Sequence, residues 1–450
     1  MPRISPPGSI FEMAGILAEA GKSCYLVGGA VRDYLLGREV SDFDLATDAR
    51  PEETMRLFRR VVPTGVRHGT VTILYKGLSV EATTFRAESD YSDGRHPDRV
   101  SFAATIDEDL ERRDFTINAM AFDLRLKRLI DPHEGQADLS RRLIRAVGDP
   151  LERFREDGLR PLRAVRFAAQ LEFEIEGATL AAIPRAMDRL RLVSAERVRD
   201  EFQKSILARQ PSRAIRLMEG SGMLGELLPE LAVCRGVEQK GMHRFDVLDH
   251  LLESADAAPP ELELRLAALF HDIGKPAAKV EVPDGEPTFH RHEELSAQLL
   301  ERLMRRLRFP TALIEETAHL VRCHMFAYDD SWSDAAVRRF LARVGTEHLE
   351  RLFALRLADG TGMTGVPADP RGLEAFRERI DRVLSEDHAF GLKDLAIGGE
   401  ELASLGVPRG KVMGMILKEL LETVLDDPSL NEAGRLKEIA ARLKGKYGLS

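Results

Sequence analysis

The chain contains few of the features that mark secreted, membrane or generally basic proteins. Three cysteines in 450 residues are too few for a disulfide framework, which favours a reducing cytoplasm. No apolar run reaches membrane-spanning length, and the N-terminus lacks the apolar core of a signal peptide, so we expect no membrane segment. The formal net charge of −9 excludes binding of nucleic acid through an overall positive charge. Any RNA contact must therefore come from local basic patches.

The length and the periodicity of the sequence predict several domains. A chain of 450 residues is too long for one hydrophobic core, so we expect two to four domains. Residues 23–145 alternate short apolar runs with turns, which is typical of a mixed α/β domain. From Pro150 onward the apolar spacing is helical, and Asp149-Pro150 supplies an acidic cap and a proline for the first helical turn. The predicted fold class is α+β, with a small mixed sheet followed by all-helical domains.

Individual elements can be placed along the chain from the same patterns. Strands are predicted at Cys24–Val27, Phe43–Ala46, Val71–Tyr75 and Val80–Thr84, with a helix at Glu52–Arg60. Later helices are predicted at Ala195–Leu207, Ser212–Gly220, Leu262–Phe270, Glu293–Leu307, Ala335–Arg343 and Leu373–Leu384. No internal repeat and no low-complexity tract interrupts this order.

The first segment that carries chemistry is a glycine turn followed by two acids. Gly28 and Gly29 lie between a predicted strand and a helix start, where a backbone without side chains can approach a phosphate. Asp42 and Asp44 flank one residue of the next predicted strand, so their side chains point to the same face. Two carboxylates held that close are costly unless a cation lies between them. The pair predicts a Mg²⁺ site for nucleotidyl transfer, and an aspartate-rich helix cap is the alternative.

Two downstream clusters fit the sugar and the base of a nucleotide. Asp114 and Asn118 are four residues apart beside Arg113, so on a helix they would share a face that suits a ribose hydroxyl and a phosphate. Asp157 and Arg160 are three apart, which places them side by side on a helix. A carboxylate that accepts from an exocyclic amino group and a guanidinium that donates to a ring nitrogen match cytosine and adenine, and reject uracil and guanine. A capped helix start and a plain intrahelical ion pair are the alternatives.

Together these segments resemble the bacterial tRNA nucleotidyltransferase and poly(A) polymerase family, which includes the CCA-adding enzymes. The resemblance rests, in chain order, on residues 25–33, 42–47, 112–120, 131–135 and 156–167. It implies four domains: a nucleotidyltransferase head at residues 1–148, a helical neck at 149–225, a helical body at 226–370 and a helical tail at 371–450.

The resemblance also implies roles for single residues. Asp42 and Asp44 would bind Mg²⁺, and Asp157 and Arg160 would read the base of CTP or ATP. The remaining nucleotide-binding residues would be Gly28, Gly29, Arg32, Arg113, Asp114, Asn118, Arg163 and Arg166. Pro161 departs from the family pattern: inside the base-reading helix it removes a backbone donor and predicts a kink, and Gly158 loosens the same turn.

Two further segments bear on the type of enzyme. Residues 84–97 resemble the loop with which CCA-adding enzymes switch from C to A, which argues against an enzyme that adds only CC. The acidic net charge favours the tRNA-directed branch over the more basic poly(A) polymerases. In residues 394–418, Arg409 and Lys411 at a glycine-bounded helix start are predicted to contact tRNA phosphates, and a helical packing element with surface charges is the alternative.

A second set of ligand-type residues is spread over the later helices. His271-Asp272, followed by Gly274-Lys275, resembles the HD phosphohydrolase superfamily. The full candidate set is His250, His271, Asp272, His292, His324 and Asp359. Imidazoles and carboxylates from several helices can bind one or two divalent ions, here Mn, Ni, Mg or Fe, and His290 is an alternative to His292. The resemblance implies either hydrolysis of 2′,3′-cyclic or 2′-phosphate RNA ends or a retained scaffold.

The expected function is template-independent addition of CMP and AMP, from CTP and ATP, to the 3′ end of tRNA. The expected partners are tRNA, CTP and ATP, with no membrane, and the expected compartment is the cytoplasm. An enzyme that adds only A, a poly(A) polymerase, and an HD phosphohydrolase as the main activity are the alternatives. The sequence does not predict the oligomeric state.

Overall fold

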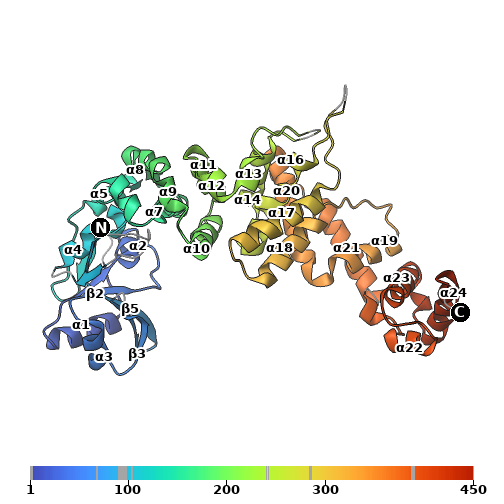
Figure 1. The fold of residues 1–450 in the computed structure, drawn as a ribbon, viewed down its shortest axis with the longest axis horizontal. Helices are drawn as coiled ribbons and strands as arrows, with labels where there is room; N and C mark the ends of the chain where they lie inside the picture. The colour runs from blue at the N-terminus through green and yellow to red at the C-terminus, as the bar shows by residue number, and fades with distance from the viewer. Residues whose placement is uncertain are drawn as a thin grey trace. The chain divides into compact units, whose positions relative to one another are not determined.

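The described part of the chain forms two compact units. The computed structural model describes residues 4–66, 69–89, 99–102, 105–239, 241, 243–282, 286–386 and 391–448 (Figure 1). The first unit comprises Met1–Ala232 and Arg306–Phe309, and the second comprises Val233–Arg305 and Pro310–Ser450. Of the loop predicted at residues 84–97, residues 90–97 lie outside the described residues.

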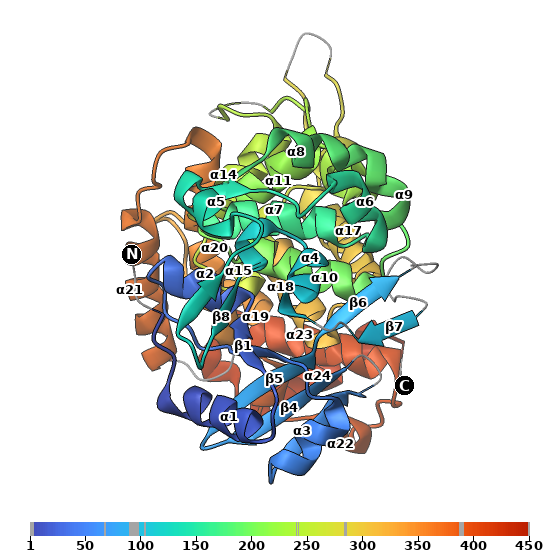
Figure 2. The same cartoon turned by 90° about the vertical axis from the view of Figure 1, so that its left-hand side faces the viewer.

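A seven-stranded mixed sheet forms the N-terminal part of the first unit (Figure 2). Its order is β3-β4-β5-β2-β1-β8-β9, and β2 pairs parallel with β5 while the other neighbours are antiparallel. The strands are β1 (Cys24–Val27), β2 (Asp44–Thr47), β3 (Val61–Gly65), β4 (Thr70–Tyr75), β5 (Leu78–Thr84), β8 (Ala121–Asp123) and β9 (Arg128–Ile130). Two small sheets pair β6 (Arg86–Ser89) with β7 (Arg99–Phe102) and β10 (Leu143–Ile144) with β11 (Glu174–Ile175).

The central strands carry the first candidate site at one end. Leu26 of β1 and Leu45 of β2 are fully buried, as expected for strands in the middle of a covered sheet. Val27 pairs with Asp44, so the glycine turn after β1 lies beside the start of β2. The predicted strand over Phe43–Ala46 begins one residue later, at Asp44, and the prediction that both acids lie on the strand is therefore wrong for Asp42.

Helices make up the rest of the first unit. They are α1 (Gly8–Glu19), α2 (Gly29–Leu35), α3 (Pro51–Leu57), α4 (Ile106–Glu111), η2 (Thr116–Asn118), α5 (Gly135–Arg141), α6 (Pro150–Glu156), α7 (Arg160–Leu171), α8 (Gly177–Ala182), η3 (Pro184–Ala186), α9 (Met187–Leu190), α10 (Ala195–Ile206), α11 (Pro211–Gly220), α12 (Met223–Leu227) and α13 (Pro229–Ala232). The start of α6 is as predicted: the Asp149 carboxylate accepts from the Glu152 amide at 2.9 Å, and Pro150 occupies the first turn.

The predicted base-reading helix is two helices. α6 ends at Glu156 and α7 begins at Arg160, so Asp157 and Arg160 do not share a helix face and that prediction is wrong. A Cβ atom on Gly158 would lie 2.3 Å from the Arg189 carbonyl oxygen, so only glycine permits this close approach. Pro161 occupies the first turn of α7, where a missing amide costs little, and the predicted kink is replaced by this break.

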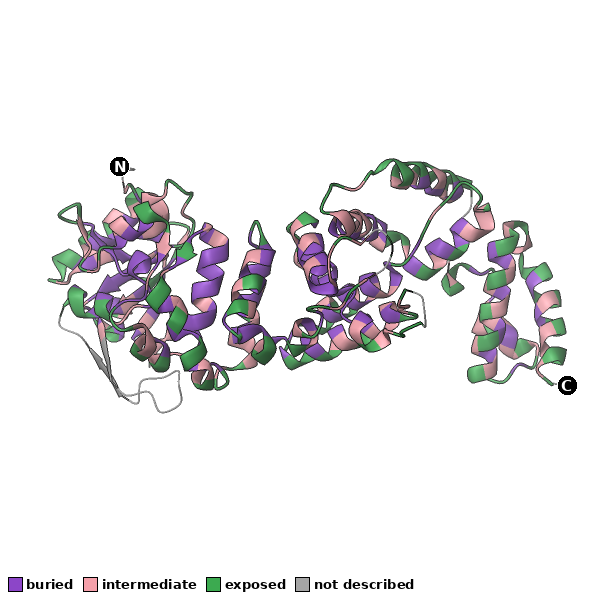
Figure 3. Cartoon of the chain, turned by 90° about the horizontal axis from the view of Figure 1, so that it is seen from above, coloured by how far each residue is buried: buried purple, intermediate pink, exposed green. Residues whose placement is uncertain are grey.

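The second unit is helical. Its elements are α14 (Val247–Ala257), α15 (Leu262–Phe270), α16 (Lys275–Ala278), α17 (His292–Arg306), α18 (Thr311–Cys323), α19 (Asp334–Val344), η4 (Thr346–His348), α20 (Leu349–Thr364), α21 (Arg371–Glu386), η5 (Leu392–Asp394), α22 (Gly399–Ser404), α23 (Lys411–Asp426), η6 (Pro428–Leu430) and α24 (Ala433–Lys446). Several helices bury one side and expose the other (Figure 3). The predicted helices lie within about one turn of these bounds.

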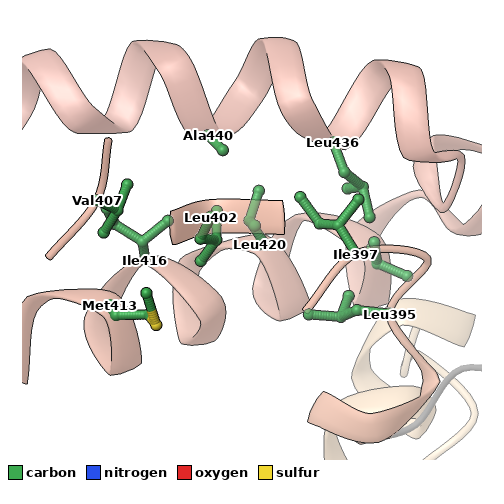
Figure 4. Packing of buried hydrophobic residues seen from close by; sticks show 10 residues of the cluster. Leu395, Ile397, Leu402, Val407, Met413, Ile416, Leu420, Leu436 and Ala440 are labelled. Atoms are coloured by element: carbon green, nitrogen blue, oxygen red, sulfur yellow. The ribbon is translucent and has the colours of Figure 1, made fainter. Parts of the chain in front are cut away.

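The C-terminal helices enclose a hydrophobic cluster of their own. Leu402 of α22, Ile416 and Leu420 of α23, and Leu436 and Ala440 of α24 are fully buried in it (Figure 4). The predicted α+β class, with a mixed sheet followed by helices, is confirmed. None of the described helices has the length and apolar character needed to cross a membrane.

Candidate functional site

A cleft of about 540 Å³ in the first unit brings together the residues predicted to bind the nucleotide. Its lining includes Gly28, Gly29, Arg32, Asp42, Asp44, Arg113, Asp114, Asn118, Asp157, Arg160, Arg163 and Arg166. These residues come from β2, from α2 and the turn before it, from η2 and the loop before it, and from α7 and the loops beside these elements, so segments more than a hundred residues apart meet at one cavity.

A third carboxylate joins the predicted acid pair. Asp44 on β2 lies opposite Glu81 on the parallel strand β5, and Glu81 lines the same cleft. Burial and the charges of Asp42 and Glu81 raise the pKa of Asp44 to about 6, while Arg113 opposes the rise. The sequence analysis missed Glu81, although the alternation of β5 leaves it on the face opposite the buried Val80 and Ala82.

The donor chemistry of this wall fits a magnesium-type ion. Carboxylate oxygens are the ligands that Mg²⁺ prefers, and a cation beside Asp44 would relieve the repulsion that raises its pKa. The three acids do not form a closed cage, because among the described residues three ligand atoms come within 4.8 Å only at two groups in the other unit. An ion here would complete its coordination with water and substrate phosphate oxygens.

The glycine turn keeps this wall accessible. Gly28 has a φ of 68°, in the left-handed region that favours glycine. A Cβ atom there would lie 3.0 Å from Nη1 of Arg113 and 3.7 Å from Oδ2 of Asp44. Any other residue at this position would therefore be strained and would crowd both charged groups.

The predicted sugar-binding group is assembled by a 3₁₀ turn rather than an α-helix. Asn118 ends η2 and donates from Nδ2 to Oδ1 of Asp114 at 3.1 Å, while its own Oδ1 accepts from Arg32 at 2.8 Å. Arg163 donates twice to Oδ2 of Asp114, at 2.8 and 2.7 Å. Burial raises the pKa of Asp114, but the Arg163 charge and the hydrogen bonds from Asn118 and Arg163 bring it down to about 2.

Asp157 and Arg160 both line the cleft, yet each is held by other partners. Asp157 accepts from the Leu159 amide at 3.0 Å and from Nη2 of Arg197 at 2.7 Å. Arg160 donates to the Arg153 and Arg112 carbonyl oxygens, at 2.7 and 2.9 Å, and pairs with Glu156. The alternative interpretation, an intrahelical ion pair between Asp157 and Arg160, is therefore not found among the described residues, and the two groups are held separately.

Arg197 and Glu201 of α10 hold side chains that line the cleft, and the sequence analysis predicted neither of them. Arg197 holds Asp157, and Glu201 accepts from Nε of Arg166 at 2.5 Å and from Nη1 of Arg163 at 3.5 Å. Glu201 is only 4% exposed, so its charge is balanced inside the protein. These partners lie at least 35 residues away in sequence, and no local spacing pointed to them.

The histidine and aspartate set meets in the second unit. His250, His271, Asp272, His292, His324 and Asp359 are all buried, and several of them line a cavity of about 330 Å³. They include two groups of three ligand atoms that share Asp272: one with His250 and His271, the other with His292 and His324. Oδ1 of Asp359 lies 3.4 and 3.5 Å from Nε2 of His250 and His271, so it lies beside the two histidines of the first group.

The orientation of the imidazoles fits a divalent metal. Nδ1 of His271, His292 and His324 lies 2.9, 2.8 and 2.7 Å from the carbonyl oxygens of residues 268, 289 and 321, which leaves each Nε2 free to face the cluster. Nε2 of His292 and Oδ1 of Asp272 are 3.0 Å apart, and neither makes a hydrogen bond within the described residues. Buried polar atoms of this kind are those that an ion would satisfy.

Cationic and further imidazole groups surround this set. Lys275 lies 2.6 Å from Oδ2 of Asp272, and Arg356 lies 2.6 Å from Oδ2 of Asp359. His290, the predicted alternative to His292, lines the cavity without joining either ligand group. His243 was not predicted and also lines the cavity, where burial and the charge of Lys275 lower its pKa to about 4.

The predicted RNA contacts of the tail lie on its surface. Lys411 is the first residue of α23, Gly410 before it has a φ of 133°, and Arg409 and Lys411 are both exposed. Their exposure is compatible with a phosphate contact and equally with an ordinary surface.

Comparison with known proteins adds independent findings. Three family models match: the poly A polymerase head domain at residues 24–145, a probable RNA-binding and SrmB-binding site of polymerase A at 172–234, and the HD domain at 241–363. A CCA-adding enzyme of Lactobacillus delbrueckii subsp. bulgaricus is 35% identical over 425 residues, covering 94% of this chain and 95% of that one. The chain belongs to the CCA-adding enzyme family. It is accordingly a nucleotidyltransferase, as the sequence analysis expected.

Two further members of the CCA-adding enzyme family show how far along the chain the similarity extends. The enzyme of Lactobacillus helveticus is 49% identical over 216 residues, 48% of this chain and 54% of that one. The crystal structure of the Bacillus stearothermophilus CCA-adding enzyme in complex with CTP matches with a TM-score of 0.73 and 28% identity, over 98% of both chains. The likeness therefore extends through both units.

Proposed function

We propose that this chain adds CMP and AMP, from CTP and ATP, to the 3′ end of tRNA without a nucleic-acid template. The observation that carries the proposal is the cleft of the first unit, in which the acids of β2 and β5, the glycine turn and the Asp157 and Arg160 side chains line one cavity. Family membership, shown by the 35% identity over 94% of the chain, supports the same reaction.

Asp42 and Asp44 would hold Mg²⁺, which when bound neutralises phosphate charge and lowers the pKa of the attacking 3′-hydroxyl. Gly28 and Gly29 would let the triphosphate approach the backbone, because a side chain at Gly28 would crowd Arg113 and Asp44. Arg32 and the arginines of α7 would balance the phosphate charge. Asp114 and Asn118 would orient the ribose from the side of η2.

Asp157 and Arg160 would read the base. A carboxylate held by Arg197 and a guanidinium held by Glu156 present one acceptor and one set of donors, which suits the amino group and ring nitrogen of cytosine or adenine. Asp157→Ala should relax base choice more than it weakens metal binding. If that variant still rejected UTP and GTP as well as the wild type does, the assignment would be wrong.

The decisive experiment supplies three tRNA substrates, ending at the discriminator base, at C and at CC. Each is incubated with CTP, with ATP and with both. Addition of CCA to the first substrate supports the proposal, addition of A to the CC end alone identifies an A-adding enzyme, and a long run of A identifies a poly(A) polymerase. Failure of correctly folded wild-type protein to extend any of the three substrates would overturn the proposal.

A second activity is supported by a separate observation. The imidazoles of the second unit present Nε2 atoms toward Asp272 and Asp359 in a cavity lined by Lys275 and Arg356, an arrangement that suits a divalent ion and a phosphate ester. We propose that this site hydrolyses 2′,3′-cyclic or 2′-phosphate RNA ends, with Mn, Ni, Mg or Fe as the candidate ion. His271→Ala should abolish both the opening of 2′,3′-cyclic phosphate ends to monoesters and the release of inorganic phosphate from 2′-phosphate ends, and Asp42→Ala should abolish neither.

The remaining proposals concern organisation and place. Residues 1–148 would act as the catalytic head, 149–225 as the neck, 226–370 as the HD body and 371–450 as the tail. Arg409 and Lys411 of the tail would contact tRNA phosphates. The protein would work in the cytoplasm, and its three cysteines, all buried and without disulfides, are compatible with a reducing compartment.

A further inference from the structure

One aromatic ring lies among three guanidinium groups of the nucleotide cleft. Phe167 belongs to α7, lines the cleft and is only 4% exposed. The Cζ atom of Arg166 lies 3.8 Å from the ring centroid, and those of Arg32 and Arg163 lie 5.2 and 5.4 Å away. All three distances fall within the range of cation–π attraction.

The three arginines come from two separate parts of the first unit. Arg32 belongs to α2 beside the sheet, while Arg163 and Arg166 belong to α7. Each guanidinium already has a carboxylate partner: Arg32 has Asp33 at 2.8 Å, Arg163 has Asp114 at 2.7 Å and Arg166 has Glu201 at 2.5 Å. The carboxylates therefore hold the edges of the guanidinium planes, and the Phe167 ring is the group that the three share.

The ring is itself fixed in place. Phe115 packs against it edge to face, with the centroids 5.8 Å apart and the planes at 81°. Phe115 is fully buried, so the ring of Phe167 contacts the hydrophobic core as well as the guanidinium groups. A ring anchored in this way limits the rotamers of the arginines that contact it.

We infer that Phe167 positions Arg32, Arg163 and Arg166 to bind the triphosphate of the incoming nucleotide. The inference rests on the proposed function, because it takes a nucleoside triphosphate as the ligand of the cleft. Three cations in one cleft repel each other, and long side chains lose rotamer freedom when they bind a ligand. A shared aromatic face offsets the repulsion and orders the arginines in advance, so less entropy is lost on binding.

The same geometry separates this role from base stacking. A ring that stacks on a base must offer it a free face. Here the Arg166 guanidinium lies 3.8 Å from the ring centroid, and little of the side chain is exposed. Phe167 therefore acts on the phosphate end of either nucleotide, through the arginines, and not on the choice between CTP and ATP.

The test uses the full-length protein and a tRNA substrate. Phe167→Leu keeps an apolar side chain and removes the ring, and it should raise KM for both CTP and ATP by about tenfold, equivalent to about 1.4 kcal/mol. The change in kcat should stay within about twofold, because the arginines remain present once substrate is bound. Phe167→Tyr keeps the ring and should recover most of the lost affinity.

The matched control is Phe173→Leu. Phe173 is 3% exposed, follows α7 in the same unit and has the Arg142 guanidinium 5.8 Å from its ring, but it does not line the cleft. It should lower the melting temperature without changing KM for either nucleotide. If Phe167→Leu changed only the melting temperature, as this control does, the positioning role would be refuted.

Two inhibitors distinguish a failure of the inference from a failure of the proposed function. Phe167→Leu should weaken inhibition by inorganic tripolyphosphate about tenfold and leave inhibition by cytidine unchanged. Equal weakening of both would overturn the inference, because the effect of the ring would not be confined to phosphate binding. No weakening of either would also overturn it, whether or not the wild type adds CCA. If the wild type bound tripolyphosphate as expected but added no nucleotide to tRNA, the positioning role would stand and the proposed function would fall.

Discussion

The two candidate metal sites differ in how the protein balances the negative charge of their aspartates. In the cleft of the first unit, burial and two neighbouring carboxylates raise the pKa of Asp44 to about 6. In the second unit, burial of Asp272 is outweighed by His271 and Lys275, which hold its pKa well below the usual range. The first site therefore carries charge that the protein leaves uncompensated, and the second carries charge that the protein balances.

This difference predicts how each site would bind an ion. Among the described residues, the acids of the cleft do not form a close group of three ligands, so an ion held there by Asp42 and Asp44 would need the phosphates of the nucleotide to complete its coordination. Three imidazoles of the second unit, those of His271, His292 and His324, are fixed by backbone carbonyl groups and lie around Asp272, so an ion there would remain with the protein. One site suits an ion that exchanges at every turnover, and the other suits a resident ion.

The largest effect is expected from the acids of the cleft. Asp42→Ala should lower kcat/KM for nucleotide addition by at least about a thousandfold, because loss of the proposed metal ligand would remove several kcal/mol of transition-state stabilisation and each 1.4 kcal/mol is about tenfold. Incorporation of labelled nucleotide into tRNA measures this. Glu52→Ala, an exposed acid on α3, is the control and should leave the rate unchanged. If Asp42→Ala added nucleotides at a rate near that of the wild type, the cleft would not be a metal site of this reaction.

The second site should lose its ion without any effect on the first. His271→Ala should abolish the retention of divalent metal after gel filtration, measured by elemental analysis, while CCA addition stays within about twofold of the wild type. His290→Ala changes a histidine that lines the same cavity but belongs to neither ligand group, and it should retain the metal. Equal loss in both variants would show that the cavity is disturbed and that no defined ligand set exists.

Neutralising one aspartate in each site should change stability with opposite signs. In chelator at pH 8, Asp44→Asn should raise the melting temperature, because the raised pKa means that the ionised carboxylate destabilises the fold above about pH 6. That gain should shrink as the pH falls below 6, where the wild-type group is protonated. Asp272→Asn should lower the melting temperature. The lowered pKa of Asp272 means that its ionised form stabilises the fold at every pH above the usual pKa of an aspartate, which includes pH 8.

The loss at Asp272 should exceed the gain at Asp44, since breaking a buried ion pair costs about 3–5 kcal/mol. Scanning calorimetry of both variants at pH 8 and pH 5 measures the signs. If the melting temperature fell for both variants at pH 8, the inference that the cleft carries uncompensated negative charge would be wrong.

The smallest effect is expected in the tail. Replacing Arg409 and Lys411 by alanine should raise KM for tRNA about three- to tenfold and reduce the slope of log affinity against log salt by about one for each tRNA phosphate that is no longer bound. KM for CTP and release of phosphate from short RNA ends should not change. Arg371→Ala, which removes an exposed arginine paired with Asp369, is the control. A change in KM for CTP would contradict this prediction, because it would show that the two residues affect nucleotide binding and not only tRNA binding.

The sequence predicted those features that depend on residues close to each other in the chain. The glycine turn, the acids beside it and the segments that line the cleft follow from residues within one turn or one strand of each other. The apolar run placed α15 at its observed bounds, because a helix that is apolar on all sides lies inside the core, and residues 264–270 are all buried. The histidine and aspartate set was predicted from residue type and order, and the fold brings all of its members together.

The failures share one physical cause, which is packing between distant segments. Asp157 and Arg160 have helical spacing, but the close approach of Gly158 to the Arg189 backbone breaks the helix between them. Glu81 depends on a parallel pairing of β2 with β5 that no local pattern reveals. Arg197 supports the cleft from a helix forty residues further along the chain, and its position follows from tertiary packing.

The pairing of Asp44 with Glu81 has a consequence for folding. Side chains on a strand alternate between faces, so a slip of one residue between β2 and β5 would turn a carboxylate away from the cleft and would also turn the buried Val80 and Ala82 toward the exposed face. The burial of these small apolar side chains therefore fixes the register that places the two carboxylates side by side. Core packing on one face of β5 sets the geometry of the acids on the other.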